Sequence, residues 1–361
     1  MRTDPTSTDD QPDERAPERQ VSLGRRLRDP RSIGSIVFGL ALLFLLFRIL
    51  LDVDFEATWA LIAAANVGLL LVAVVAYYAT FPLRGFRWSF ILGRAGTHVG
   101  LRAATETVFV AWFVNCLVPA KLGDLYRAYI LKGNFGTSMS RTVGTVFIER
   151  AGDLVVMSWL ALAAGWWSFR GRSRPEIDAF FLVGFAVGAI LLASVIALRY
   201  AGGNLARWMP ARIAELYRLF HEGSTHPLTI RSVPIIGLVT LVVWLLEGVR
   251  LFFVIRALGL PDANLGISAA IFVALAGSLL TVIPLTPAGI GFVEAGIVGA
   301  MGIYGVPVEQ GVAVALTDRA ITILTVIVLG GLVYAFSPMV RRAHGFGTRT
   351  RPAAEGRLDT S

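Results

Sequence analysis

The chain gathers its apolar residues into long continuous runs instead of spacing them along one face of each helix. Each run approaches or exceeds the roughly 20 residues that a helix needs to cross about 30 Å of hydrocarbon. A large soluble protein would show helices with one polar face instead. We therefore predict an all-α integral membrane protein. The apolar runs cover about 33–51, 57–82, 142–167, 179–199, 233–255 and 312–336.

Two more apolar stretches, about 104–131 and about 267–305, are each broken midway by a turn that contains proline and glycine. Proline cannot donate a helical hydrogen bond, and glycine permits a tight backbone turn. A broken backbone at membrane depth is stable only where protein or a water-filled cavity surrounds it. We therefore predict two re-entrant helical hairpins. Their turns contain Pro119, Gly123, Pro287, Gly289 and Gly291.

The two turns match in sequence, and each is followed by an acid–Arg–Ala triplet inside an apolar run. The turns are Pro119-Ala120-Lys121-Leu122-Gly123 and Pro287-Ala288-Gly289-Ile290-Gly291. The triplets are Glu149-Arg150-Ala151 and Asp318-Arg319-Ala320. Two Pro/Gly turns can resemble one another by chance. The matching triplets and the parallel order of the apolar runs favour an internal duplication.

The predicted membrane domain at 33–337 then divides into repeat halves at about 33–167 and about 179–336. Each half has two spanning helices, a re-entrant hairpin and one further helix. Three crossings are an odd number, so the second half should run in the opposite direction, which makes the halves inverted repeats. The polar segments 1–32 and 338–361 are expected to be cytoplasmic tails, and we predict that the first is disordered.

Basic residues place both termini in the cytoplasm, because Lys and Arg concentrate in cytoplasmic loops. Arginines precede the first run and follow the last one. The segment 168–178 disagrees with this topology, because its three arginines would lie outside. A further group of arginines follows the second run and is assigned to a cytoplasmic loop. This group is Arg84, Arg87, Arg94 and Arg102.

Composition narrows the possible functions. The chain is 55% hydrophobic and 16% charged, with a mean hydropathy of +0.66, which fits a membrane protein. Its net charge of +8 comes mostly from arginines at helix ends, where they meet anionic headgroups, so we expect no nucleic-acid partner. The single cysteine excludes an intramolecular disulfide, and the four histidines lack metal-ligand spacing, so we expect neither metal nor cofactor.

Several ionisable residues lie inside the apolar runs, where each costs at least about 2.5–3.5 kcal/mol at the centre of an isolated helix. One interpretation is structural ion pairing that holds helices together. The other is a polar chamber in which Arg and Lys side chains bind a phosphate. Helix N-termini after Pro119 and Pro287 would add free N–H groups. The candidate substrate-binding residues are Asn115, Lys121, Asp124, Arg127, Glu149, Arg150, Asp153, Glu247, Arg250, Thr286, Glu294, Asp318 and Arg319.

For two kinds of residue within these runs, we favour a structural role over contact with a substrate. Asn115 lies four residues before Pro119, where its amide would bridge the broken backbone; substrate contact is the alternative. Six tryptophans lie mostly near predicted helix ends, which is typical of interfacial belts. They are Trp59, Trp88, Trp112, Trp166, Trp167 and Trp244.

Taken together, three motifs resemble the flippase-like membrane family, whose best-known example is the N-terminal membrane half of lysylphosphatidylglycerol synthase/flippase. The resemblance covers about residues 33–337. Asp124 stands where the family pattern suggests Glu, and Ala288 where it suggests Gly. The motifs are Asn115-x-x-x-Pro119-x-Lys121-x-Gly123-Asp124-x-x-Arg127, Glu149-Arg150-x-x-Asp153 and Pro284-x-Thr286-Pro287-x-Gly289-x-Gly291-x-x-Glu294.

The resemblance implies a multi-pass protein of the cell membrane that translocates a lipid with a phosphate-containing headgroup. Such a lipid would be, for example, an aminoacyl-phospholipid or a polyprenyl-phosphate-linked sugar. The sequence has no Ser/His or Cys/His set, so we do not expect an enzyme. The alternatives are a secondary transporter of a small anionic solute, and a non-transporting membrane partner or lipid enzyme. Expected partners are membrane lipids, an envelope lipid-modifying enzyme or glycosyltransferase, and a second copy of the chain.

Overall fold

The structure is a computed structural model that describes residues 54–170, 175–260, 265–281 and 286–349. The run at 33–51 and the tail at 1–32 lie outside these residues. Helices make up the described part of the chain, with no strand in it. The helices are α3 (Phe55–Ala63), α4 (Val67–Arg94), α5 (Leu101–Leu117), α6 (Leu122–Phe135), α7 (Met139–Ser168), α8 (Pro175–Ala201), α9 (Ala211–Thr225), α10 (Ser232–Leu258), α11 (Ile267–Leu280), α12 (Phe292–Ile303), α13 (Val308–Arg319), α14 (Thr325–Phe336) and α15 (Pro338–Arg349).

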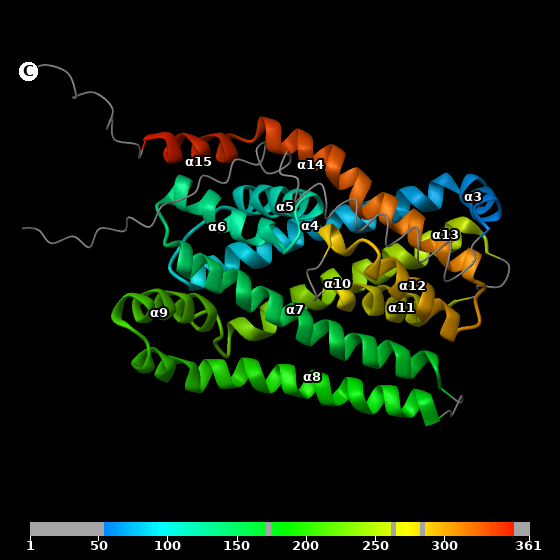
Figure 1. Cartoon of the computed structure of the whole chain (residues 1–361), viewed down its shortest axis with the longest axis horizontal. Helices are drawn as coiled ribbons and strands as arrows, with labels where there is room; N and C mark the ends of the chain where they lie inside the picture. Colours follow the sequence, from blue (N-terminus) through cyan, green and yellow to red (C-terminus); the bar gives the residue numbers. More distant parts are fainter. Residues whose placement is uncertain (1–53, 171–174, 261–264, 282–285, 350–361) are drawn as a thin grey trace, which may run out of the picture.

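The helices α4 and α10 form the centre of the molecule and pack against each other more extensively than any other described pair. Figure 1 shows α7 beside this centre, with α8 and α9 as an outer layer on one side and α14 and α15 on the other. The first hairpin, α5 and α6, lies next to α4. The second hairpin, α11 and α12, lies next to α10. Matching elements of the two halves of the chain therefore surround one central helix pair.

Four described helical segments are long and apolar enough to cross a membrane: Val67–Arg94, Gly184–Trp208, Ser232–Leu258 and Val308–Phe336. The helix α7 is not among them, although it covers the predicted run at 142–167. Charged residues in its middle lower its hydropathy. Four of the five predicted runs that fall on described residues therefore contain a helix of spanning length, and the fifth, which α7 covers, does not meet this criterion.

The expected single helix at 57–82 is wrong at both ends. A break at Ala64–Asn66 divides the segment into α3 and α4, and the Asn66 side chain caps α4 by accepting from the Leu69 N–H. The helix α4 then continues past Pro82 as far as Arg94. The loop predicted after this run begins only beyond Arg94. The prediction failed because Arg84 and Arg87, which lie inside α4, interrupt the apolar run and were taken to mark its end.

Both predicted turns are present, and each joins two antiparallel helices. In the first turn, Ala120 and Lys121 have positive φ values of 62° and 52°. The Asn115 side chain accepts a hydrogen bond from the Gly123 N–H at 2.8 Å, so the expected amide bridge across the turn is confirmed. An added Cβ at Gly123 would lie 2.1 Å from the Ala111 carbonyl oxygen, so α6 approaches α5 too closely for a side chain there.

The second turn is longer than the first. Pro287–Gly289 form a short 3-10 helix, and α12 begins only at Phe292. Positive φ values at Ala288, Gly289 and Gly291 carry the backbone round this turn. Both turns therefore use left-handed backbone, which glycine adopts easily and alanine or lysine adopts at a cost of about 1–3 kcal/mol.

The helix α13 continues into α14 through a π-helical segment, Ala320–Leu324, which starts directly after Asp318 and Arg319. Side chains of α4 bind this segment, because Tyr77 donates to the Thr322 carbonyl oxygen at 3.3 Å. Tyr78 lies 2.6 Å from the Thr325 hydroxyl. The second acid–Arg–Ala triplet thus lies at an irregular helical segment, a feature that is frequent at functional sites.

The helix α15 packs along α6 within the segment predicted as a C-terminal tail. Tyr129 donates to the Ala343 carbonyl oxygen at 3.1 Å, and Asn134 donates to the Met339 carbonyl oxygen at 2.8 Å. Gly133 allows the close contact, since a Cβ added there would lie 2.7 Å from the Ala343 Cα. The C-terminal helix therefore contacts the first hairpin.

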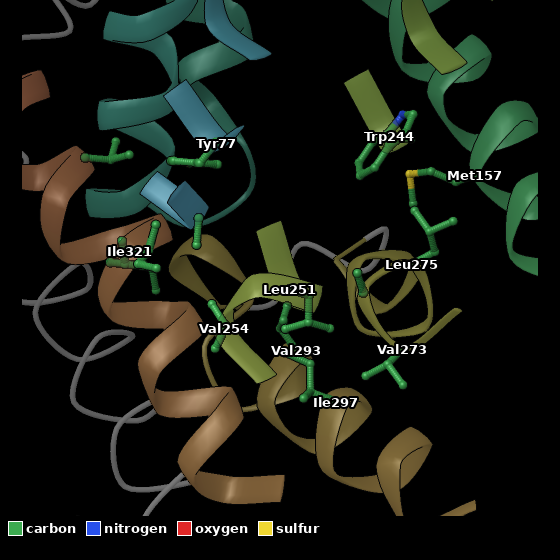
Figure 2. Close-up of a cluster of buried hydrophobic side chains, with 14 of the residues drawn as sticks. Tyr77, Met157, Trp244, Leu251, Val254, Val273, Leu275, Val293, Ile297 and Ile321 are labelled. Carbon is green, nitrogen blue, oxygen red and sulfur yellow. The ribbon is translucent and has the colours of Figure 1, made fainter. Parts of the chain in front are cut away.

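The apolar core includes residues of both hairpins and of the helices packed against them. Figure 2 shows residues from α4, α7, α10, α11, α12 and the π-helical segment converging there. Tyr77, Met157 and Trp244 belong to this cluster, and Leu251 and Leu275 within it are fully buried. Between membrane-spanning helices, van der Waals packing of such side chains stabilises the helix contacts, so the core fixes the positions of the charged side chains beside it.

Candidate functional site

The predicted charged residues form a buried ion-pair network between α4, α6, α7, α10, α12 and α13. In the first half, Glu149 accepts from Arg87 at 2.7 Å and from Arg127 at 2.8 Å. Arg87 also donates to Asp153 at 2.6 Å and to the Thr240 hydroxyl at 2.7 Å. Each of these charges therefore has an opposite charge within direct contact, as a buried charge requires.

Each hairpin is tied to the triplet that follows it in the sequence. Arg150 donates twice to Asp124, with Nε to Oδ2 at 2.9 Å and Nη2 to Oδ1 at 2.8 Å. In the second half, Arg319 Nε donates to Glu294 at 2.9 Å and Arg319 Nη2 donates to the Ala288 carbonyl oxygen at 2.5 Å. Both acids lie in the first turn of the second helix of their hairpin. The duplicated sequence pattern thus corresponds to a duplicated contact.

The central helices carry a third matching set. Arg84 and Arg87 are three residues apart on α4, and Glu247 and Arg250 are three apart on α10. Arg87 binds the acid of the first triplet, and Arg250 binds Asp318, the acid of the second, at 2.9 Å. Between them, Arg84 donates to Glu247 at 2.6 Å, and Arg250 donates to the same carboxylate at 2.5 Å. This set joins the two halves directly.

A cavity of about 350 Å³ lies beside this network. Residues from α4, both hairpins, α7, α10 and the π-helical segment line it. The predicted residues that line it are Asn115, Lys121, Arg150, Asp153, Glu247, Arg250, Thr286, Gly289, Asp318 and Arg319. The structure therefore brings most of the candidate binding residues together around one space.

Other predicted residues do not line the cavity. Arg127 and Glu149 are buried and pair with each other. Glu149 also binds Arg87, which in turn binds the lining residue Asp153. Glu294 accepts from the Gly291 N–H at 2.8 Å and holds Arg319 in place. Glu294 therefore positions a lining residue and does not itself line the cavity. Asp124 does the same for Arg150. The turn residues Pro119, Gly123, Pro287 and Gly291 also lie outside the lining.

Sequence reasoning missed the contribution of α4. Arg84 and Arg87 were assigned to a cytoplasmic loop, yet each is 1% exposed and buried in the ion-pair network. Their partners lie 62 to 163 residues away, on α7 and α10. A signal was present in the sequence, since their spacing of three residues matches that of Glu247 and Arg250.

The interfacial assignment of the tryptophans is wrong for three of the six. Trp88 is fully buried, and the Arg127 guanidinium lies 4.8 Å from its ring centre. The Trp112 ring contacts both Arg84 at 4.5 Å and Arg150 at 4.8 Å. Trp244 donates from its indole nitrogen to Asp153 at 3.1 Å. These three rings stabilise the buried cations by cation–π contact or fix their carboxylate partners.

The side chains that line the cavity are suited to binding an anion. Within the described ranges, no group of three or more His, Cys, Asp or Glu residues could hold a metal ion. Cys116 lines the cavity as a buried thiol, with no histidine among the lining residues. The arrangement can bind an anion and hold it among fixed dipoles and charges, since guanidinium and ammonium groups suit phosphate oxygens.

Comparison with known proteins gives relatives over most of the chain. A UPF0104 membrane protein of Methanocaldococcus jannaschii is 32% identical over 222 residues, which is 62% of this chain and 93% of that protein. A UPF0104 membrane protein of Methanothermobacter thermautotrophicus is 26% identical over 282 residues, 72% of this chain and 82% of that protein. Glycosyltransferase AglD of Haloferax volcanii is 28% identical over 295 residues, 72% of this chain and 47% of AglD.

The family model that matches is described as the lysylphosphatidylglycerol synthase TM region, and it covers residues 32–330. That range contains both hairpins, both triplets and the whole ion-pair network. The match confirms the resemblance inferred from the three motifs. The chain therefore belongs to the membrane-protein family of the lysylphosphatidylglycerol synthase transmembrane region.

Proposed function

We propose that the protein translocates a lipid with a phosphate-containing headgroup across the bilayer. The observation that carries the proposal is the cavity of about 350 Å³, lined by cationic side chains from both halves of the chain. Charged groups inside apolar helices are expensive and usually mark a substrate pathway. Here they lie between helices long enough to cross a membrane. A charged headgroup could pass through such a chamber while its acyl chains stay in lipid.

The proposal includes an inverted repeat with re-entrant hairpins. The matching contacts Asp124–Arg150 and Glu294–Arg319 support a two-fold relation between the halves. An axis in the membrane plane would bring both hairpin turns to the cavity near mid-membrane, as in many transporters. Both termini would then lie in the cytoplasm, in agreement with the positions of the basic residues.

The proposal assigns binding and movement to the protein, with no bond made or broken in its cavity. A lipid-modifying enzyme would supply the substrate or consume it. The similarity to AglD, a protein named as a glycosyltransferase, supports an enzyme of that class as a partner. A second copy of the chain is a further proposed partner.

A secondary transporter of a small anionic solute is the second candidate. The volume of the cavity favours it, because about 300–1,000 Å³ is usual for a small-molecule site. The two candidates differ in the substrate that moves. A translocase exposes a lipid headgroup on the far leaflet, whereas a solute transporter moves a water-soluble anion and leaves lipids in place.

The test is headgroup accessibility of labelled lipids in proteoliposomes. The lipids are phosphatidylglycerol, lysyl-phosphatidylglycerol and a polyprenyl-phosphate sugar, with protein-free vesicles as the baseline. We expect flipping of at least one lipid with wild-type protein and loss of it in Arg150→Gln and Arg319→Gln. Arg102→Gln is the matched control, because Arg102 is an exposed arginine of the first hairpin.

Folding of each variant is checked by size-exclusion chromatography and thermal unfolding. The double variant Asp124→Asn/Arg150→Gln keeps the charge balance and guards against an effect of the unpaired carboxylate alone. Wild-type protein that is folded but flips none of the three lipids would contradict the proposal. Flipping that persists in both arginine variants would contradict the assignment of the binding site. The proposed translocation itself would stand.

A further inference from the structure

Lys121 differs from every other cation that lines the cavity. The lining arginines are Arg84, Arg150, Arg250 and Arg319, and each forms an ion pair with a carboxylate. Among the described residues, Lys121 has no acid within ion-pair distance. The chain has just two lysines, Lys121 and Lys132, so arginine serves at every paired position of the network. Arginine suits paired sites because its planar fork binds a carboxylate bidentately.

The charges of the site therefore do not cancel. Six arginines of the network face six carboxylates, and Lys121 adds one positive charge to this balanced set. The arginines are Arg84, Arg87, Arg127, Arg150, Arg250 and Arg319. The carboxylates are Asp124, Glu149, Asp153, Glu247, Glu294 and Asp318. A site with one excess positive charge in surroundings of low dielectric is completed by a ligand with one negative charge.

Arg84 supplies a second sign of a missing anion. It is 1% exposed and lines the cavity, yet its Nε and Nη1 have no hydrogen-bond partner. Buried guanidinium N–H groups are almost always satisfied, so two orphaned donors on one side chain call for an acceptor. The Trp112 ring connects Arg84 with Arg150, and Arg150 lies close enough to Lys121 for their charges to interact. The free donors thus share one region of the cavity.

The backbone holds Lys121 in an unusual conformation. Its φ of 52° and that of Ala120 at 62° lie in the left-handed region, which costs a side-chain-bearing residue about 1–3 kcal/mol. The Asn115 amide closes the turn from the other side. The turn therefore presents the lysine at the cavity wall in a fixed backbone geometry.

We infer that the cavity is specific for a headgroup with a single net negative charge, a phosphodiester without an ammonium group, and that Lys121 is its anchor. This inference rests on the proposed lipid translocation. An aminoacylated headgroup carries ammonium groups that need free carboxylates. Asp153, Glu247 and Asp318, the acids that line the cavity, are already bound by arginines. An added ammonium group would meet only the repulsion of Lys121.

The experiment uses the two lysines as a binding probe that is independent of transport. Wild-type protein in nanodiscs of phosphatidylcholine is treated with an amine-reactive reagent, and modification of each lysine is measured by mass spectrometry. Separate discs contain phosphatidylglycerol or lysyl-phosphatidylglycerol in equal fraction. A further arm adds soluble glycerophosphoglycerol, which has the same phosphodiester, to phosphatidylcholine discs. Lys132 does not line the cavity and serves as the internal control.

We expect phosphatidylglycerol to slow the modification of Lys121 by about tenfold, the effect of one charged hydrogen bond, and to leave Lys132 unchanged. Lysyl-phosphatidylglycerol and phosphatidylcholine should give no protection. Equal protection by lysyl-phosphatidylglycerol, or none by phosphatidylglycerol, would overturn the inference. Protection by the soluble diester alone would overturn the assignment to a lipid headgroup.

Transport variants separate this inference from the proposed function. Lys121→Gln removes no ion pair, so it should fold as the wild type does and flip phosphatidylglycerol about tenfold more slowly. Lys121→Arg should restore most of the rate, and Lys132→Gln should have no effect. If phosphatidylglycerol protects Lys121 but the wild type flips no lipid, the proposed translocation is contradicted. The anion site at Lys121 is then still supported. Flipping that is equally fast in Lys121→Gln would keep translocation and overturn the anchor.

Discussion

At the scale of single residues, Arg87 is the cation of α4 that binds both carboxylates of α7. Its guanidinium contacts both Glu149 and Asp153 and donates to Thr240, and the side chain is 1% exposed. Removal of one partner from a buried ion pair leaves an uncompensated charge. Arg87→Gln would take one cation from each of two carboxylates, which leaves Glu149 with Arg127 and Asp153 with Arg150 at 3.5 Å. We expect the free energy of unfolding to fall by about 3–5 kcal/mol, measured as a lower Tm in detergent micelles.

The control is Arg94→Gln, at the exposed end of the same helix, which should leave Tm nearly unchanged. Neutralising the two acids that lose a cation as well, in Arg87→Gln/Glu149→Gln/Asp153→Asn, should recover part of the loss. A Tm for Arg87→Gln equal to that of Arg94→Gln would show that the buried pairs do not stabilise the fold.

At the scale of elements, α15 is held on the first hairpin by contacts that include a histidine. His344 lies 3.2 Å from the Tyr126 hydroxyl and beside the rings of Tyr129 and Tyr334. Burial lowers the pKa of His344 below its ordinary value of 6.5, so the docked helix binds a proton less readily than a detached one. Docking is therefore fully stable above that pH, and it weakens as the pH falls.

We expect the amides of α15 to exchange hydrogen faster at about pH 5 than at about pH 7.5, after correction for intrinsic rates. Hydrogen-exchange mass spectrometry of residues 338–349 measures this, with α10 as the reference helix. In His344→Gln the difference between the two pH values should disappear. Equal protection of α15 at both pH values in the wild type would contradict the prediction.

Helices were predicted best where hydropathy is continuous. The runs at 179–199 and 233–255 match α8 and α10 within a few residues, because a long apolar segment has few alternatives to a helix. The hairpin turns at Pro119 and Pro287 were also found, since proline and glycine act locally. The sequence could not place Arg84 and Arg87, because the carboxylates that make their burial favourable are distant in the chain. A prediction from hydropathy therefore assigned these two buried arginines to a loop.

At the scale of the whole molecule, the two halves are joined by polar contacts as well as by the core. Arg84 binds Glu247, and Tyr129 binds the carbonyl oxygen of Ala343. We expect halves expressed separately, divided between α7 and α8, to be unstable alone and to copurify when expressed together. A pull-down through a tag on one half measures this. Two halves that are each stable and do not associate would contradict it.

The ion pair between Arg84 and Glu247 has a consequence for the ancestry of the fold. The two residues hold matching places on α4 and α10, and they meet where the halves meet. On a two-fold axis of a dimer of identical chains, a residue can only meet its own copy. Under the proposed two-fold relation, such a dimer would set arginine against arginine or glutamate against glutamate. After gene fusion the two positions can diverge in sequence. Opposite charges at the axis then favour pairing of a first half with a second half over pairing of two identical halves.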